Sequence, residues 1–172
     1  MANRTSVYIG IDPGLDGAVA VLDAEGRILA CNNTPTLTIK VGRGNRRQYV
    51  VAQMVSLLQY YGGAPNAVVG LEFVRAMPDQ GVTSMFSMGR GVGLWEGIIT
   101  ALGFPLIQIT PQVWKRAMLG PGMGSDKNAS ILQALALFPT QAPALLTRKK
   151  DHNRAEALLI AEYLRRKETY HA

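Results

Sequence analysis

Cysteine is almost absent from this chain, which carries a single one, Cys31, among its 172 residues. One thiol cannot close an intrachain disulfide, and a zinc site made of cysteines needs several thiolates. We therefore expect neither feature. A chain without disulfides is typical of a reducing compartment, and we expect this one in the cytoplasm of a bacterium or of a phage-infected host.

Long apolar runs are also missing, since no stretch approaches the roughly 20 apolar residues that span a bilayer. Residues 1–6 lead directly into a strand-like run, so we expect no signal or transit peptide and no membrane partner. With 48% apolar and 17% charged residues, the composition predicts a globular protein with one domain over residues 1–172.

Acidic residues are scarce relative to basic ones: 12 Asp and Glu stand against 18 Lys and Arg, a net charge of +6. An excess of this sign favours a polyanionic partner such as nucleic acid. The bases gather in two clusters, and a solvated surface is the alternative interpretation of either cluster taken alone. The first comprises Arg27, Lys40, Arg43, Arg46 and Arg47, and the second Arg148, Lys149 and Lys150.

The apolar pattern predicts an α/β fold built on a mixed sheet. A turn at residues 24–26 joins the second and third strands, so the chain begins with an antiparallel meander. Residues 34–45 are expected to form an irregular basic loop. The expected strands are residues 7–12, 17–23, 27–33, 67–73 and 104–110, and the expected helices are 47–61, 87–102, 111–118, 126–138 and 153–167.

Two carboxylates lie where a buried strand should carry none. Asp12 ends the run VYIGID, and Glu72 lies near the end of VVGLEF. Buried carboxylates are normally paired or bound to metal, and sites in α/β sheets form at the carboxyl ends of strands. If the two strands are neighbours, both acids emerge at the same edge. A turn acid is the alternative for Asp12, whereas Glu72 has no comparable explanation.

A second pair of acids lies in KKDHNRAEALLIAEY, where the last helix begins. Glu156 precedes three apolar residues at helical spacings of three, four and seven, and therefore points with them toward the sheet. Asp151 would lie about 140° away on a helix, so we expect it at or before the cap. His152 and Asn153 are also within one turn of Glu156, and either could join the cluster. Capping and helix-dipole roles are the alternatives for the two acids.

Four converging carboxylates repel one another unless a cation lies between them. Carboxylate oxygens favour Mg²⁺ or Mn²⁺. Two such ions about 3.5–4 Å apart activate a water and stabilise the leaving oxygen of a phosphodiester. The acids therefore predict metal-dependent phosphodiester hydrolysis.

Three motifs resemble the RuvC-type Holliday junction resolvases of the RNase H-like superfamily: IGIDPG, VVGLE and KKDHNRAEALLIAEY, in this order. The segments GRGVGLWEGIITALGF and PQVWKRAMLG are similar to the chloroplast (monokaryotic chloroplast) branch of that family. The resemblance extends over residues 7–166. It implies an RNase H-like mixed five-stranded sheet, antiparallel in its first three strands, with helices on both faces.

The resemblance also implies a crossover junction endodeoxyribonuclease, which resolves four-way DNA junctions by paired symmetric nicks. It implies a homodimer, because each active site nicks one strand, and two Mg²⁺ or Mn²⁺ ions per site. The implied catalytic and metal-binding residues are Asp12, Glu72, Asp151 and Glu156. In bacterial members the last two acids are three residues apart, where this chain has Asn153. Asp151, His152 and Asn153 are therefore all candidates for the fourth ligand.

Other side chains are expected to contact the junction. Cations near the acids would bind phosphates, which positions a duplex without reading its sequence. An apolar side chain after Glu72 would wedge between bases, with core or dimer packing as the alternative. The expected phosphate contacts are Lys115, Arg116, Lys127, Arg148, Lys149 and Lys150, and the possible wedge residues are Phe73, Met77 and Phe86.

The expected helix over 87–102 carries a stripe of glycines, Gly89, Gly93 and Gly97. Close approach of DNA or of a partner subunit and tight packing on the sheet are both compatible with it. Trp95 and Trp114 are expected in the core or an interface.

Three other functions share part of this pattern. A less selective nuclease acting on flaps, forks or RNA–DNA hybrids needs the same acids. A non-catalytic junction-binding protein needs none of them, and the presence of all four favours catalysis. Actin-like nucleotide-binding proteins also begin with IDPG, but they need two such domains, for which 172 residues are too few.

Overall fold

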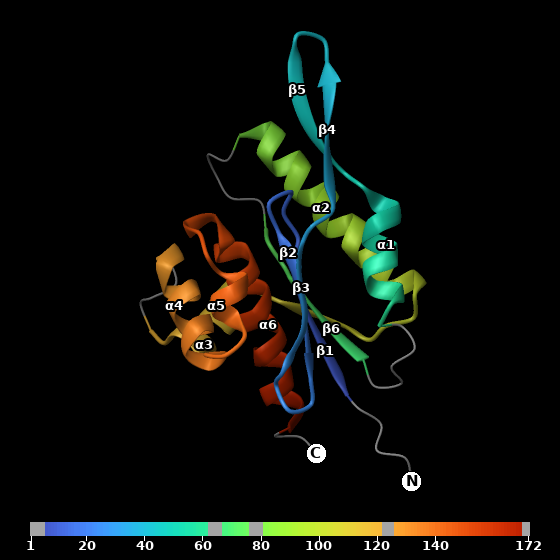
Figure 1. The fold of residues 1–172 in the computed structure, drawn as a ribbon. Coiled ribbons are helices and arrows are strands. Elements are labelled where there is room, and N and C mark those ends of the chain that lie inside the picture. Colours follow the sequence, from blue (N-terminus) through green and yellow to red (C-terminus); the bar gives the residue numbers. More distant parts are fainter. Residues whose placement is uncertain (1–5, 62–66, 76–80, 122–125, 170–172) are drawn as a thin grey trace.

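A five-stranded sheet lies at the centre of the computed structural model, which describes residues 6–61, 67–75, 81–121 and 126–169 (Figure 1). Its strands are β1 (Val7–Asp12), β2 (Ala18–Asp23), β3 (Ile28–Asn33), β6 (Ala67–Glu72) and β7 (Leu106–Ile109). In space their order is β3-β2-β1-β6-β7. The first three strands are antiparallel, and β6 and β7 continue the sheet parallel to β1. The predicted mixed sheet with an antiparallel start is confirmed.

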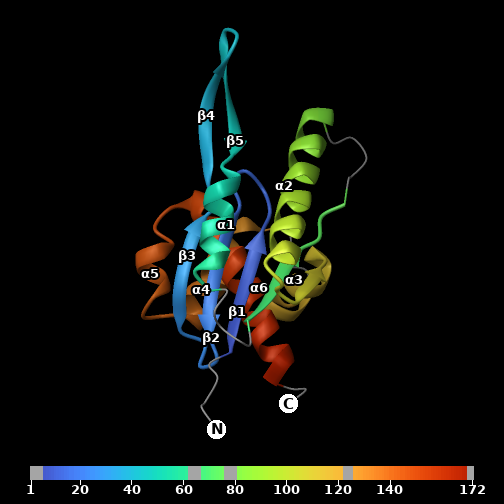
Figure 2. The same cartoon turned by 90° about the vertical axis from the view of Figure 1, so that its right-hand side faces the viewer.

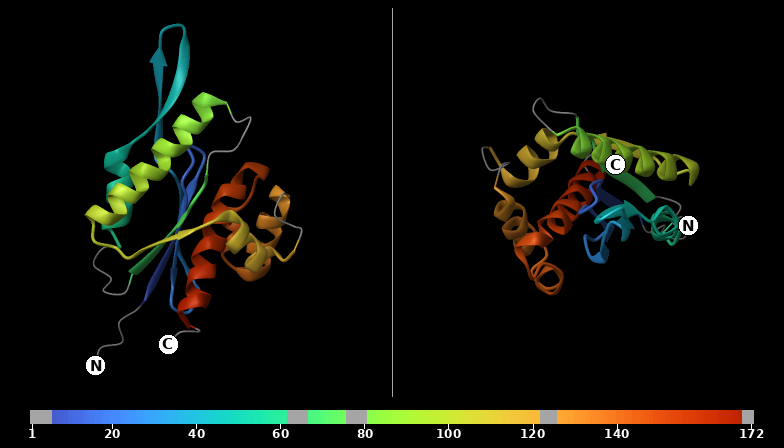
Figure 3. Two further views of the ribbon diagram at one scale, coloured as in Figure 1. Left: turned by 180° about the vertical axis from the view of Figure 1, so that it is seen from behind. Right: turned by 90° about the horizontal axis from the view of Figure 1, so that it is seen from above.

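Helices cover both faces of this sheet, as expected (Figure 3). One face carries α1 and α2, and the other carries α3 to α6. The helices are α1 (Val51–Gln59), α2 (Val82–Ala101), α3 (Pro111–Leu119), α4 (Lys127–Leu137), α5 (Ala142–Leu145) and α6 (His152–Thr169), with a 3-10 turn η1 (Lys149–Asp151) leading into α6. Among the helices of the described ranges, none has the length and apolar character needed to cross a membrane.

The two faces hold separate cores because side chains alternate along each strand. On β1, Val7, Ile9 and Ile11 belong to the core beneath α1 and α2, whereas Tyr8 belongs to the core beneath α6. Gly10 also faces α6, and a Cβ at this position would lie 2.2 Å from the carbonyl oxygen of Ala157. The absence of a side chain therefore lets α6 pack directly against β1, the strand that ends at Asp12.

A β-hairpin forms where the sequence predicts an irregular loop over residues 34–45, so this prediction is wrong. Strands β4 (Thr36–Val41) and β5 (Gly44–Tyr49) pair antiparallel and project away from the sheet (Figures 1 and 2). The threonine, isoleucine and valine residues of β4 favour an extended backbone. Gly42 takes a positive φ of 59° in the turn, which glycine adopts without strain.

The starts of two helices differ from the prediction, and one further helix is present. Helix α1 begins at Val51 rather than at residue 47, because residues 47–49 belong to β5. Helix α2 begins at Val82 rather than at 87, and the short α5 is a helix that the sequence does not predict. These elements depend on pairing and packing with distant segments, which local periodicity does not report.

The glycine stripe of α2 lies on an open face. A Cβ built on Gly89, Gly93 or Gly97 would meet no heavy atom within 4 Å, so the stripe does not pack on the sheet. Trp95 and Trp114, in contrast, are both fully buried, which confirms their expected place in the core.

Candidate active site

Asp12 and Glu72 lie side by side at one edge of the sheet. Their strands β1 and β6 are parallel neighbours, and Ile11 pairs with Leu71 one residue before the two acids. Alternation from Gly10 and Gly70, which contact α6, turns both carboxylates toward that helix. Both residues are more than nine-tenths buried. The expectation that the two acids share an edge is therefore confirmed.

The buried negative charge of Asp12 is only partly offset by its surroundings. Burial raises the pKa of its carboxyl well above the usual range, and the negative charges of Glu72 and Glu156 raise it further. The backbone N–H of Gly14 and the ammonium of Lys115 lower this pKa only in part. A divalent cation would favour the ionised carboxylate, because its charge offsets both burial and repulsion.

Glu72 is held by a buried tryptophan. The indole Nε1 of Trp114 on α3 donates a hydrogen bond of 2.8 Å to its Oε1. Burial nevertheless raises the pKa of Glu72; the Trp114 hydrogen bond lowers it, Glu156 raises it and Lys115 lowers it. The tryptophan therefore fixes one oxygen of the carboxylate.

Glu156 approaches the two strand acids from the first turns of α6. Its Oε1 lies 3.0 Å from Nζ of Lys115 and accepts a hydrogen bond of 3.2 Å from Ser130 Oγ. Lys115 also lies over the Trp114 ring, 5.2 Å from its centroid. An internal ammonium ion thus supplies part of the positive charge that these three acids need.

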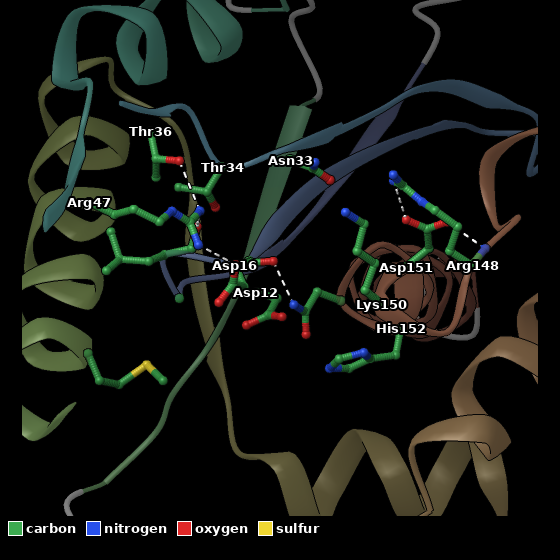
Figure 4. Close-up of a pocket in the computed structure, with 15 residues that line it drawn as sticks. Asp12, Asp16, Asn33, Thr34, Thr36, Arg47, Arg148, Lys150, Asp151 and His152 are labelled. Carbon is green, nitrogen blue, oxygen red and sulfur yellow. Dashed lines mark hydrogen bonds and ion pairs between the residues drawn. The ribbon is translucent and has the colours of Figure 1, made fainter. Parts of the chain in front are cut away.

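Asp151 is engaged elsewhere. Its carboxylate pairs with Nη2 of Arg148 at 2.8 Å and accepts hydrogen bonds from the backbone N–H groups of Thr147 and Arg148. The guanidinium of Arg148 lowers the pKa of Asp151, in contrast to the raised pKa of Asp12. Figure 4 shows the Asp151 carboxylate directed at Arg148 rather than at Asp12. Arg148 has to release Asp151 before this carboxylate can reach a cation beside Asp12.

Two other candidates for the fourth ligand line the cavity next to Asp12. Asn153 Nδ2 donates a hydrogen bond of 2.6 Å to the carbonyl oxygen of Asp16, in the loop that follows β1. His152 lies farther along, with Nδ1 3.2 Å from the carbonyl oxygen of Lys149. The cavity has a volume of about 800 Å³ and contains Asp12, Asp151, His152 and Asn153 in its lining. Of the three candidates, Asn153 is the one bonded to the Asp12 loop.

The donor chemistry of this edge fits a divalent cation. The described residues include no three His, Cys, Asp or Glu side chains that already converge on one metal position. The charges of Glu72 and Glu156 nevertheless raise the pKa of Asp12, and that of Glu156 raises the pKa of Glu72, so the three acids are close. Hard oxygen ligands of this kind suit Mg²⁺ or Mn²⁺. A cation would therefore need side-chain movements that bring these carboxylates together.

The expected DNA contacts fall into distinct environments. Arg116, Lys149 and Lys150 are exposed, whereas Lys115 is mostly buried against Glu156 and Arg148 pairs with Asp151. The side chain of Lys127 lies outside the described residues.

The possible wedge residues differ in the same way. Phe86 projects from α2 and is 73% exposed. Phe73 is half-buried after β6, with the guanidinium of Arg75 5.8 Å from its ring. Met77 lies outside the described residues.

Several contacts were not foreseen from the sequence. The hydrogen bond of Trp114 to Glu72, the approach of Ser130 to Glu156 and the pairing of Arg148 with Asp151 all join residues of the site. The first two connect separate elements, and no local pattern signals them. The pairing of Arg148 with Asp151 could have been predicted, because an arginine three residues before an acid can reach it across one turn.

Known proteins share this fold. The chain superimposes on Thermus thermophilus RuvC in complex with a Holliday junction substrate with a TM-score of 0.59 and 16% identity, covering 97% of this chain and 98% of that one. A second Thermus thermophilus RuvC structure gives a TM-score of 0.55 and 16% identity, covering 94% and 96%. The expected RNase H-like fold of the RuvC type is confirmed.

One curated protein is similar in sequence. The chloroplastic Holliday junction resolvase MOC1 of Chlamydomonas reinhardtii is 37% identical over 100 residues, which is 58% of this chain and 11% of that protein. The chain thus spans about a tenth of the relative's length. No family model matches the chain. The expected resemblance to the chloroplast resolvase branch is confirmed at the level of this aligned segment.

Proposed function

We propose that this chain is a structure-selective, metal-dependent endodeoxyribonuclease that resolves four-way DNA junctions by paired symmetric nicks. One observation carries the proposal: Asp12 and Glu72, two buried acids with raised pKa values, lie at the carboxyl ends of adjacent strands. The RuvC-type fold and the similarity to a chloroplast resolvase support the same activity. Junction cleavage would make the chain a phosphodiester hydrolase.

We infer that Asp12, Glu72 and Glu156 hold the cation, with Asp151, His152 and Asn153 as the candidates for the fourth position. Mg²⁺ or Mn²⁺, in two copies, would supply an activated water and neutralise the oxygen that leaves the phosphodiester. Trp114 keeps Glu72 oriented through its hydrogen bond. Lys115 limits the repulsion among the acids through its ion pair with Glu156.

Cleavage would leave a 5′-phosphate and a 3′-hydroxyl, which a ligase reseals. The exposed side chains of Arg116, Lys149 and Lys150 are placed to bind phosphates beside the site. Arg148 would bind a phosphate only after leaving Asp151. Phe86 is the best exposed of the described wedge candidates, and apolar side chains of this kind separate stacked bases.

We further infer a homodimer, since two symmetric nicks match a twofold assembly. The open glycine face of α2 is compatible with close approach of a second helix, and the exposed Val82 and Phe86 add apolar surface to this helix. Residues 1–172 would form one nuclease domain. The cytoplasm of a bacterium or a phage-infected host stays a prediction, while the algal relative is named as chloroplastic.

The proposal is tested with a synthetic four-way junction, a linear duplex of the same sequence, a flap, a fork and an RNA–DNA hybrid. We expect paired, ligatable nicks in the junction with Mg²⁺, none with a chelator, and little cutting of the duplex. Comparable cutting of flaps or hybrids would favour the less selective nuclease. Tight junction binding without cleavage in either Mg²⁺ or Mn²⁺ would favour a non-catalytic binding protein.

A further inference from the structure

The loop at residues 13–17, which follows Asp12, has a tightly constrained geometry. Gly17 donates a backbone hydrogen bond of 2.9 Å to Gly14, and a Cβ on Gly17 would lie 2.0 Å from the carbonyl oxygen of Asp12. The turn therefore folds back onto the backbone of the acid itself. The loop is therefore in direct contact with the backbone of Asp12.

Arg47, near the end of β5, binds this loop from the side of the hairpin. Its Nη2 donates hydrogen bonds to the carbonyl oxygen of Leu15 at 2.6 Å and to Thr36 Oγ1 at 2.9 Å, while Nη1 pairs with the Asp16 carboxylate. One planar guanidinium thus joins both hairpin strands to the loop, and a lysine could not make the same set of contacts.

Tyr49, two residues later, binds the loop one step closer to Asp12. Its hydroxyl lies 3.4 Å from the carbonyl oxygen of Pro13 and 3.1 Å from that of Ser87 on α2. A Cβ on Gly91 would come within 2.4 Å of both the Pro13 oxygen and the Tyr49 hydroxyl. Glycine at position 91 is therefore required for α2, Tyr49 and the loop to meet.

The loop is fixed from the opposite side by α6, through the hydrogen bond from Asn153 to the carbonyl oxygen of Asp16. Arg46, which directly precedes Arg47 on β5, is exposed and makes no hydrogen bond to this loop among the contacts of the described residues. Adjacent arginines of one strand thus have different surroundings, which makes Arg46 a matched control for Arg47.

We propose that Arg47 and Tyr49 are positioning residues that hold the 13–17 loop, and through it Asp12, in the arrangement needed for cation binding. The inference rests on the proposed function, because it assigns the two residues to that same site. It also gives the β4–β5 hairpin a role at this site, because Arg47 and Tyr49, at the end of β5, would set the position of Asp12 on the sheet. This role requires no contact of either residue with the reacting phosphate.

The test compares Arg47→Met and Tyr49→Phe with the control Arg46→Met. For each protein we would measure the dissociation constant for a four-way junction without divalent cation, the cleavage rate at saturating junction, and the half-saturating Mn²⁺ concentration. In Arg47→Met and Tyr49→Phe we expect the saturated rate to fall about tenfold and the half-saturating Mn²⁺ concentration to rise about threefold, with junction affinity within about twofold. Arg46→Met should keep the wild-type Mn²⁺ concentration.

Two results would overturn the inference: weaker junction binding with a normal saturated rate, or wild-type values for all three quantities. If the wild type cuts no branched DNA, the proposed function is wrong, and the positioning role of Arg47 is then tested by calorimetric Mn²⁺ titration. Equal Mn²⁺ affinity of the wild type and Arg47→Met would contradict this positioning role. So would a lack of Mn²⁺ binding by the wild type. Circular dichroism and thermal melting exclude misfolding, which Tyr49→Phe is chosen to avoid because the buried ring is retained.

Discussion

Asp12 and Asp23 end adjacent antiparallel strands, yet their environments are opposite. Both are buried, and because β1 and β2 run in opposite directions they lie at opposite ends of the sheet. Asp23 accepts a 2.8 Å hydrogen bond from the backbone N–H of Arg27 and pairs with the guanidinium of the same residue. Burial raises its pKa, but these hydrogen bonds and charges lower it below the usual value. Asp12 has no comparable arginine partner in the described structure, and its pKa is raised.

A similar contrast separates Glu162 from Glu72. Glu162, in the second half of α6, pairs with Arg165 and Arg166, both at 2.7 Å, and these partners lower its pKa despite burial. Glu72 has a neutral tryptophan as its hydrogen-bond partner, and its pKa is raised. One end of the molecule therefore holds neutralised, structural acids. The other end holds Asp12 and Glu72, whose pKa values are raised because no arginine offsets their buried charge in the described structure, a pattern that is frequent at functional sites.

The largest expected effect is on catalysis. Asp12→Asn keeps the shape of the side chain and removes its negative charge, so we expect single-turnover junction cleavage to fall by at least about 1,000-fold. Junction binding, measured by electrophoretic mobility shift, should survive the change. Cleavage near the wild-type rate would show that Asp12 is a turn acid without a catalytic role.

Asp23→Asn should have the converse effect. The substitution removes the charge that Arg27 binds at the far end of the sheet, so we expect the free energy of unfolding to fall by about 1–3 kcal/mol. Urea denaturation provides the measurement, and cleavage by the folded variant should match the wild type. A loss of cleavage without a loss of stability would contradict the assignment of Asp23 to a structural role.

The pH dependence of stability should separate the two aspartates. The raised pKa of Asp12 means that its ionised form destabilises the fold above that pKa, and the penalty disappears as pH falls toward the ordinary aspartate value of about 3.9. The lowered pKa of Asp23 means that its contribution is complete above about pH 3.9 and is lost only as pH falls further.

Urea unfolding at about pH 8 and about pH 5 tests this difference. Without divalent cation, Asp12→Asn should be more stable than wild type at the higher pH, with a smaller advantage at the lower one. The deficit of Asp23→Asn should be the same at both. An Asp12→Asn variant that is less stable than wild type at the higher pH would contradict the raised pKa.

The smallest expected effect concerns the fourth ligand. Asn153→Ala should raise the half-saturating Mn²⁺ concentration about threefold, whereas Asp151→Asn should mainly lower thermal stability, because Arg148 and two backbone N–H groups lose a charged acceptor. Metal titration of cleavage, with thermal melting of both variants, makes the comparison. A raised half-saturating Mn²⁺ concentration in Asp151→Asn, with an unchanged one in Asn153→Ala, would make Asp151 the fourth ligand.

Local sequence patterns were sufficient to predict most of the candidate site and part of the fold. Strand alternation and the i, i+3, i+4 spacing were sufficient to orient Asp12, Glu72 and Glu156, because they depend on the chain's own geometry. The β4–β5 hairpin was missed because its polar, arginine-rich β5 strand has no apolar period. The Trp114 and Lys115 contacts depend on how α3 packs beside the sheet, and no spacing in the sequence encodes that.

The central claim is that the acids at the ends of β1 and β6 form a cation site. Calorimetric titration of Mn²⁺ into the wild type and Asp12→Asn tests this claim most directly. We predict saturable binding by the wild type that strengthens with pH, because the cation displaces protons from carboxyls with raised pKa values, and loss of this binding in Asp12→Asn. Equal binding by both proteins, or none by the wild type, would contradict the account.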